Sequence, residues 1–148
     1  MDVDDKVFVV TGAGNGIGRC VALDLVARGA TVVGADINEI GLAETGRLAV
    51  DSSRFRPQVL DIGDREAVQR FPEVVRADVG HVDGLFNIAG IAQDTQPIAE
   101  VGDDRVDLLM RVNYFGTVWL TRAFLPDLEQ RHIGKAAIGV ATCTSQQP

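Results

Sequence analysis

A glycine-rich segment near the N-terminus has the residue types and spacing that bind phosphate groups. Gly12, Gly16 and Gly18 follow the pattern Gly-x-x-x-Gly-x-Gly, after an apolar run at residues 7–10 and at the start of a segment with helical periodicity. Glycine lets a backbone turn tightly and approach a ligand, while the first turn of a helix presents N–H groups to anions. The segment predicts a site for the pyrophosphate of a dinucleotide, with an ordinary glycine-rich turn as the alternative. A Walker phosphate loop is excluded, because Gly-Lys-Ser/Thr does not follow.

Asp36 stands 18 positions beyond Gly18, directly after the apolar run of residues 31–35. A carboxylate at the end of a second strand accepts hydrogen bonds from the ribose hydroxyls of a dinucleotide and repels a 2′-phosphate. The residue therefore predicts NAD(H) in preference to NADP(H). Asp36 is also suited to cap the helix that begins near Asn38, and the two roles are compatible. Arg19 is the nearby cation that the turn could bring towards a 2′-phosphate.

These residues need a sheet whose strands end at one edge, and the hydrophobic pattern predicts one. Apolar runs of strand length alternate with amphipathic segments of helix length, which is typical of βαβ units and a parallel sheet. Strands are expected at residues 7–10, 31–35, 55–60, 82–86 and 135–140, and helices at 16–28, 38–50, 64–78 and 102–125. Pro72 is expected to interrupt the third helix, and residues 91–100 to form a loop. Right-handed crossovers then predict a single α/β domain over residues 1–148, a doubly wound, Rossmann-type parallel sheet with strand order 3-2-1-4-5.

Composition and charge restrict the class of function. Hydrophobic residues make up 46% and charged residues 24% of the 148-residue chain, as in soluble globular domains. The net charge of -7, without a cluster of lysine and arginine, argues against a nucleic-acid partner. Cys20 and Cys143 are far apart, so neither a disulfide framework nor a metal site is indicated, and a reducing, cytoplasmic setting is expected. Neither a signal peptide nor an apolar stretch of membrane-spanning length is found, so no membrane partner is expected.

Three further motifs follow the glycine-rich segment. Asp61-Ile62 comes after the expected third strand, Asn87-Ile88-Ala89-Gly90 after the fourth, and Asn113 lies in the long helix. Together with Thr11-Gly12-x-x-x-Gly16-Ile17-Gly18, they resemble in order and spacing the motifs of the short-chain dehydrogenase/reductase family. The resemblance covers nearly the whole chain, and it implies hydride transfer between an alcohol and a ketone with a nicotinamide cofactor. It implies cofactor contacts from Gly12, Asn15, Gly16, Ile17, Gly18, Asp36, Asp61, Ile62, Asn87, Ala89 and Gly90, and a catalytic role for Asn113.

The chain departs from the family pattern at three points. Ile88 replaces the second asparagine of the strand-four motif, which in the family helps to stabilise the central sheet. The expected fifth strand is followed by Ala141-Thr142-Cys143-Thr144-Ser145 in place of Asn-x-Ser-Ser, so Ser145 is the candidate catalytic serine, with Thr142 and Cys143 as alternatives. The family's Tyr-x-x-x-Lys is not found in the 148 residues, since Tyr114 has no lysine four positions later.

The sequence thus predicts an NAD-dependent oxidoreductase of this family that acts on a small-molecule alcohol or ketone, with NADP the less favoured cofactor. The chain is expected to be truncated relative to the family, with a sheet incomplete on its C-terminal side, and to be inactive alone. A non-catalytic dinucleotide-binding or regulatory module is the alternative. The long helix carries one apolar stripe with Val106, Met110 and Leu120 and a second with Phe115 and Trp119, so one face is left for a partner and a homo-oligomer is expected.

Overall fold

The fold is a parallel sheet between two layers of helices. The computed structural model describes residues 3–93, 95–130 and 135–138. Within these residues the strands are β1 (Val7–Thr11), β2 (Thr31–Asp36), β3 (Phe55–Val59), β4 (Gly84–Asn87) and β5 (Lys135–Ile138). They form a 5-stranded sheet in the order β3-β2-β1-β4-β5, with every neighbouring pair parallel. The predicted doubly wound architecture and strand order are confirmed.

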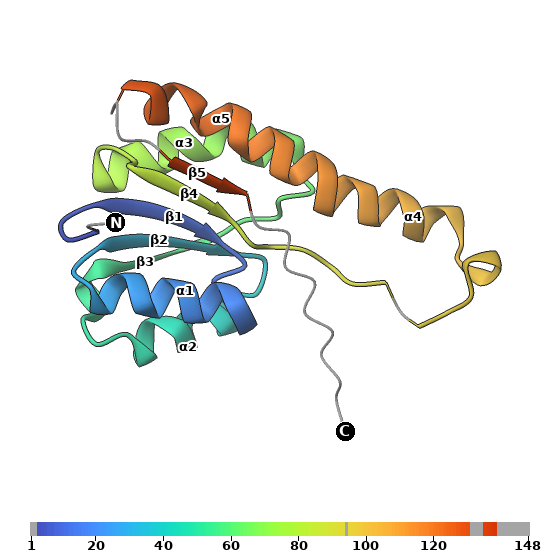
Figure 1. Cartoon of the computed structure of the whole chain (residues 1–148), viewed down its shortest axis with the longest axis horizontal. Helices are drawn as coiled ribbons and strands as arrows, with labels where there is room; N and C mark the ends of the chain where they lie inside the picture. The colour runs from blue at the N-terminus through green and yellow to red at the C-terminus, as the bar shows by residue number, and fades with distance from the viewer. Residues whose placement is uncertain (1–2, 94, 131–134, 139–148) are drawn as a thin grey trace.

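The helices divide between the two faces of the sheet. They are α1 (Gly16–Ala27), α2 (Glu39–Leu48), α3 (Arg65–Val79), α4 (Asp103–Leu109) and α5 (Thr117–Gln130), with a π-helix, η3 (Met110–Gly116), between α4 and α5. Short 3-10 turns occur at η1 (Ser52–Arg54) and η2 (Ile98–Glu100). Helices α1 and α2 cover one face of the sheet, and α3 and α5 cover the other, while α4 extends past the ends of the strands (Figure 1). In the described part of the chain, no helix is both long and apolar enough to cross a membrane.

Alternation of side chains along β1 explains why the sheet has a core on each face. Phe8 and Val10 belong to the buried cluster under α1 and α2, whereas Val9, between them, belongs to the cluster under α3 and α5. All three are at most 4% exposed, as expected for a strand covered by helices on both faces. On the α3 side, the rings of Phe71 and Phe124 meet edge to face with centroids 5.8 Å apart. Because all neighbouring strands are parallel, their carboxyl ends lie at the same edge of the sheet. The two cores hold the sheet between the helix layers.

Two expectations for the helices are wrong. Pro72 does not interrupt α3, which continues from Arg65 to Val79 with Pro72 buried inside it. The expected helix over residues 102–125 is not one α-helix, because the π-helix η3 divides it and α5 continues through Pro126 to Gln130. The wider π turns also break the apolar stripes: Leu120 is fully buried, but Met110, expected on the same face, is 47% exposed.

Candidate functional site

The glycine-rich turn between β1 and α1 is packed too closely for side chains at two positions. Gly12 has a φ of 73°, and a Cβ there would lie 2.9 Å from the backbone nitrogen of Ala89. A Cβ on Gly18 would lie only 2.0 Å from Gly12 O. The turn therefore lies directly against both the segment after β4 and the first turn of α1. Glycine at these two positions is therefore required by the tight turn and by its packing, as in dinucleotide-binding turns.

The N-terminus of α1 opens into a pocket. Asn15 caps the helix, with its Oδ1 accepting a hydrogen bond from the N–H of Gly16 at 2.7 Å. N–H groups in the first turn of a helix have no partner within the helix and attract anions. Asn15, Gly16, Ile17 and Gly18 line a pocket of about 230 Å³ together with Gly12, Asp36, Ile88, Ala89 and Gly90. The five predicted residues of the motif thus converge on one cavity with residues that follow β4.

Asp36 ends β2 and is hydrogen-bonded to two backbone amides. Its Oδ2 accepts from Gly14 N at 2.9 Å, and its Oδ1 accepts from Asn38 N at 2.9 Å. Asp36 is not the cap of α2, because Asn38 occupies that position and accepts from Gly41 N. The capping interpretation of Asp36 is therefore wrong. Its carboxylate instead joins the end of β2 to the glycine-rich turn.

A second pocket, of about 290 Å³, adjoins the first. Its walls are largely apolar and include Leu60, Ile62, Leu108 and Val112, with Asp61 among the lining residues. Both pockets are lined by Gly12, Asp36, Ala89 and Gly90. The two cavities therefore form one elongated site, with Asp36 where they meet.

Asp61 and Ile62 differ in how they meet this site. Asp61 is exposed, and its Oδ1 accepts from Gly63 N at 2.8 Å. Ile62 is 6% exposed and belongs to the core under α3 and α5. A Cβ on Gly116 would lie 2.8 Å from Ile62 O, so η3 packs directly on this segment. Asp61 and Ile62 therefore both line the second pocket, and the packing of η3 on Ile62 holds this part of the pocket wall in place.

Thr11 organises the end of β4, a role that the sequence reasoning missed. Its Oγ1 accepts hydrogen bonds from the N–H groups of Ile88 at 3.0 Å and Ala89 at 3.1 Å. Asn87 is buried, donates from Nδ2 to Thr121 Oγ1 at 3.1 Å, and has no partner for Oδ1 among the described residues. The threonine hydroxyl therefore links β1 to β4 at the point where Ile88 replaces an asparagine of the family motif.

Asn113 lies in the π-helix and holds the chain that leaves β4. Its Oδ1 accepts from Ile91 N at 2.9 Å, and its Nδ2 donates to Ile91 O at 2.8 Å. Both the oxygen and the nitrogen of the Asn113 side-chain amide are therefore hydrogen-bonded to the backbone of Ile91. π-Helical turns are rare and frequently occur at functional sites. The predicted catalytic serine, Ser145, lies outside the described residues.

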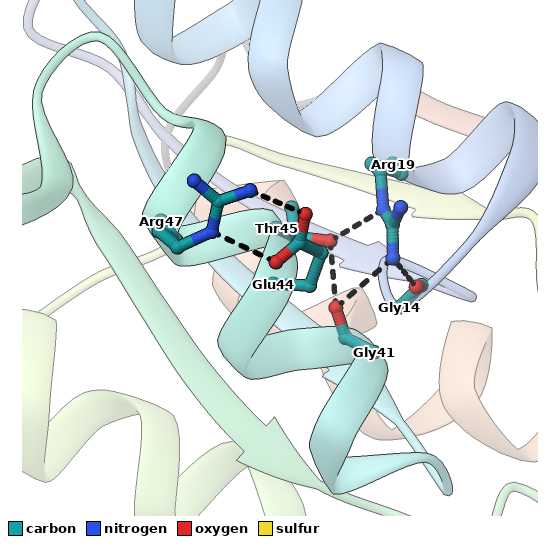
Figure 2. A network of polar contacts seen from close by, with 6 residues as sticks. All are labelled: Gly14, Arg19, Gly41, Glu44, Thr45 and Arg47. Carbon is teal, nitrogen blue, oxygen red and sulfur yellow. Dashed lines mark hydrogen bonds and ion pairs between the residues drawn. The ribbon is translucent and has the colours of Figure 1, made fainter.

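Arg19, the expected candidate partner of a 2′-phosphate, is placed differently from that expectation, and a second arginine lies at the site. Arg19 contacts Gly41 and Thr45 of α2 and Gly14 of the turn (Figure 2). It is not among the residues that line either pocket. Arg105 is the arginine among the residues that line the second pocket. Its Nη2 donates to Ala92 O, while its buried Nε has no partner among the described residues. No spacing rule pointed to Arg105, because its place depends on how α4 approaches the strand ends.

The glycine turn, the helix N-terminus and the acidic residue after β2 lie at the strand ends of a Rossmann-type fold, the arrangement typical of dinucleotide-binding proteins. A family model described as "short chain dehydrogenase" matches residues 6–147. The chain belongs to the short-chain dehydrogenase/reductase family, as its motifs predicted.

Relatives and solved structures agree with this assignment. The chain is 36% identical to "Retinol dehydrogenase 10-A" of Danio rerio over 155 residues, and the match covers 88% of this chain and 45% of that protein. It is 38% identical to "Putative oxidoreductase SadH" of Mycobacterium tuberculosis over 124 residues, which covers 83% of this chain and 45% of the relative. The structure of NAD+-bound xylitol dehydrogenase matches with a TM-score of 0.87 and 27% identity, covering 93% of this chain and 54% of that one. The chain thus spans about half the length of these relatives.

Proposed function

We propose that this chain binds NAD(H) as the cofactor-binding part of an oxidoreductase that acts on a small-molecule alcohol or ketone. The observation that carries the proposal is the position of Asp36 at the junction of the two pockets. A dinucleotide has its adenosine ribose between an apolar base and an anionic pyrophosphate. The apolar pocket, the carboxylate and the N-terminus of α1 occur in that order along the site, which supports the fit.

The chain's residues would hold the cofactor as follows. The adenine would lie against Ile62 and Val112 beside Asp61, the ribose hydroxyls would donate to Asp36, and the diphosphate would accept from the first turn of α1. The cofactor itself supplies or accepts the hydride when bound. Asn113 would keep the segment after β4 in place beside it, and by family resemblance Ser145 would steady the substrate oxygen.

Preference for NAD(H) over NADP(H) follows from the charge at Asp36. A 2′-phosphate would meet this carboxylate, and three N–H groups of Arg19 already face oxygens of the protein. Arg105 remains the cation of the apolar pocket and could offset part of that repulsion. A titration calorimetry comparison of NADH and NADPH tests the proposal directly. Tighter binding of NADPH would overturn the assignment of Asp36, and no binding of either would overturn the function.

We further propose that residues 1–148 alone bind the cofactor without turning over substrate. The 148 residues contain no Tyr-x-x-x-Lys, the pair that carries the proton in the family. Such a chain would function alone as a dinucleotide-binding or regulatory module. Retinol and xylitol, the alcohols named for two relatives, serve as test substrates. Reduction of NAD+ by the purified chain with either alcohol would contradict the inactivity, while binding without NADH formation would support it.

Self-association and a cytoplasmic location are proposed alongside this activity. Exposed apolar side chains along α4 and η3 support a homo-oligomer. Cytoplasmic location is supported by the low cysteine content, since Cys20 and Cys143 are the two cysteines of the chain. Analytical ultracentrifugation of the purified chain tests the first proposal, and fractionation of the native host cell tests the second.

A further inference from the structure

Arg19 and Thr45 connect the glycine-rich turn to α2 (Figure 2). Arg19 Nε donates to Thr45 Oγ1 at 3.0 Å, and its Nη2 donates to both Gly14 O and Gly41 O. Thr45 is fully buried, and its hydroxyl lies 2.8 Å from Ala13 O. Since a hydroxyl has one hydrogen and two lone pairs, it can accept from Arg19 and donate to this carbonyl at the same time. Three of the five guanidinium N–H groups therefore face protein oxygens.

This network fixes two successive peptide groups of the turn. In the first, Ala13 O lies within hydrogen-bond distance of Thr45 Oγ1, and Gly14 N donates to Asp36 Oδ2 at 2.9 Å. In the second, Gly14 O is held by Arg19. A trans peptide is planar, so fixing Gly14 O directs the N–H of Asn15 to the opposite side. Asn15 lines the pocket at the start of α1, so the network sets the orientation of a backbone amide of that pocket.

The contacts also connect the phosphate side of the site with the ribose side. A Cβ on Gly41 would lie 2.6 Å from Gly14 O, so the start of α2 packs directly on the turn. Asp36, which precedes α2, accepts from the same glycine. A displacement of the turn would therefore move both the amides near the proposed diphosphate and the partner of the ribose carboxylate.

We infer that Arg19 and Thr45 are positioning residues that hold the glycine-rich turn in the conformation that binds the diphosphate. Arg19 acts through the turn and is not itself a ligand of a phosphate. The inference rests on the proposed function, because it assigns the network a role in dinucleotide binding. It differs from the sequence-based expectation, in which Arg19 was a candidate partner for a 2′-phosphate.

Glu44 and Arg47, which lie on α2 beside Thr45, provide a matched control. Arg47 donates from Nε and Nη2 to the Glu44 carboxylate at 2.9 and 2.7 Å. This hydrogen bond from Arg47 lowers the pKa of Glu44. The pair is solvent-exposed, with side-chain exposures of 69% for Arg47 and 40% for Glu44. The charge of Arg19 also lowers the pKa of Glu44, but the two hydrogen bonds of Arg47 are both to Glu44. Arg47→Lys therefore makes the same chemical change as Arg19→Lys outside the network.

The first test is nucleotide binding by the full 148-residue chain, measured by titration calorimetry with NADH and NADPH as probes. Arg19→Lys keeps the charge but loses the planar donor geometry, and Thr45→Val keeps the shape but loses the hydroxyl. Each substitution should lower the affinity for NADH and the affinity for NADPH by a similar factor of about ten, which corresponds to the loss of one or two hydrogen bonds. Thr45→Ser, which restores the hydroxyl, and Arg47→Lys should bind like the parent. If Arg19→Met loses affinity for NADPH but not for NADH, and Arg19→Lys recovers it, Arg19 binds the 2′-phosphate directly. That result would overturn the inference.

The second test needs no nucleotide. Amide hydrogen exchange at Ala13 and Gly14 should become faster by about tenfold in Arg19→Lys and Thr45→Val, and stay unchanged in Arg47→Lys. Unchanged exchange, or faster exchange with unchanged NADH affinity, would overturn the positioning role. If the parent chain fails to bind NADH, the proposed function itself is wrong. The exchange rates then still decide whether the network orders the turn.

Discussion

The backbone N–H of Gly14 donates a hydrogen bond to Asp36 Oδ2 at 2.9 Å, which joins the glycine-rich turn to the end of β2. A Cβ on Gly14 would lie 2.9 Å from Asp36 Cγ, so this glycine permits the contact even though it is not one of the three glycines of the motif. The carboxylate that would bind the ribose thus also holds the turn that would bind the diphosphate. The two subsites are therefore expected to respond together to substitution of Asp36.

Asp36→Ala should lower the affinity for NADH by about 10- to 100-fold, because hydrogen bonds to a charged group contribute about 1.5–3 kcal/mol. The affinity for NADPH should fall less or rise, since removal of the carboxylate also removes its repulsion of a 2′-phosphate. Titration calorimetry with both nucleotides measures the ratio. Asp64→Ala is the control: Asp64 caps α3, so its loss should cost about 1 kcal/mol of stability and leave the ratio unchanged. An unchanged ratio in Asp36→Ala would refute the ribose assignment.

Gly18→Ala should abolish NADH binding and destabilise the fold. The added Cβ would lie 2.0 Å from Gly12 O, a backbone atom that can move only if the turn moves. Overpacking of this kind costs about 1–3 kcal/mol or more, and it also displaces the first turn of α1. Thermal unfolding and NADH titration measure the two effects. Gly102→Ala is the comparison, because a Cβ there meets nothing within 4 Å, and it should change stability by less than about 1 kcal/mol. Normal binding by Gly18→Ala would show that the turn is more adaptable than its packing indicates.

The sheet could be predicted from the sequence because its strands are uninterrupted apolar runs between helices. β2 and β3 begin at the expected residues and end within one residue of the expected bounds. Parallel strands with short connections leave few topologies, so the strand order followed from the alternation of elements. The glycine turn and Asp36 could be predicted because they directly follow apolar strands in the sequence, whereas Asn113 was predicted from the family resemblance.

The missed features depend on tertiary packing. Seven residues of π-helix differ too little in periodicity from an α-helix for the apolar pattern to reveal η3. Arg105 lines the apolar pocket only because α4 returns to the strand ends after the segment that follows β4. Arg19 lies one residue beyond the motif, but its direction depends on where α2 packs. Thr11 was visible in the motif, yet its two amide partners come from the segment after β4, more than 70 residues away.

Asn113→Ala should destabilise the chain by about 1–3 kcal/mol, because the N–H and C=O of Ile91 would both lose their partner. Hydrogen exchange at the Ile91 amide should become correspondingly faster. Chemical denaturation and residue-resolved exchange measure these effects without cofactor. Arg111→Ala, an exposed neighbour on η3, should stay within about 0.5 kcal/mol of the parent. Parent-like stability of Asn113→Ala would show that Asn113 does not hold this segment.

The last prediction concerns the exposed apolar side chains of α4 and η3. Met110, Tyr114 and Phe115 are 47%, 56% and 43% exposed, and the Phe115 ring stacks on Trp119 with centroids 5.6 Å apart. Clustered aromatic groups of this kind are enriched where proteins associate, and we expect a second copy of the chain to cover them.

Phe115→Glu should therefore weaken self-association by at least about tenfold, because burying a phenylalanine contributes about 1.5–3 kcal/mol and a buried unpaired carboxylate opposes association. Sedimentation velocity over a range of concentrations measures the dissociation constant of the oligomer. Ile40→Glu is the matched control, since Ile40 is 84% exposed on α2, on the other side of the sheet. It should leave self-association unchanged. A parent chain that sediments as a monomer at high concentration, or equal effects of the two substitutions, would show that the α4 and η3 surface is not the interface.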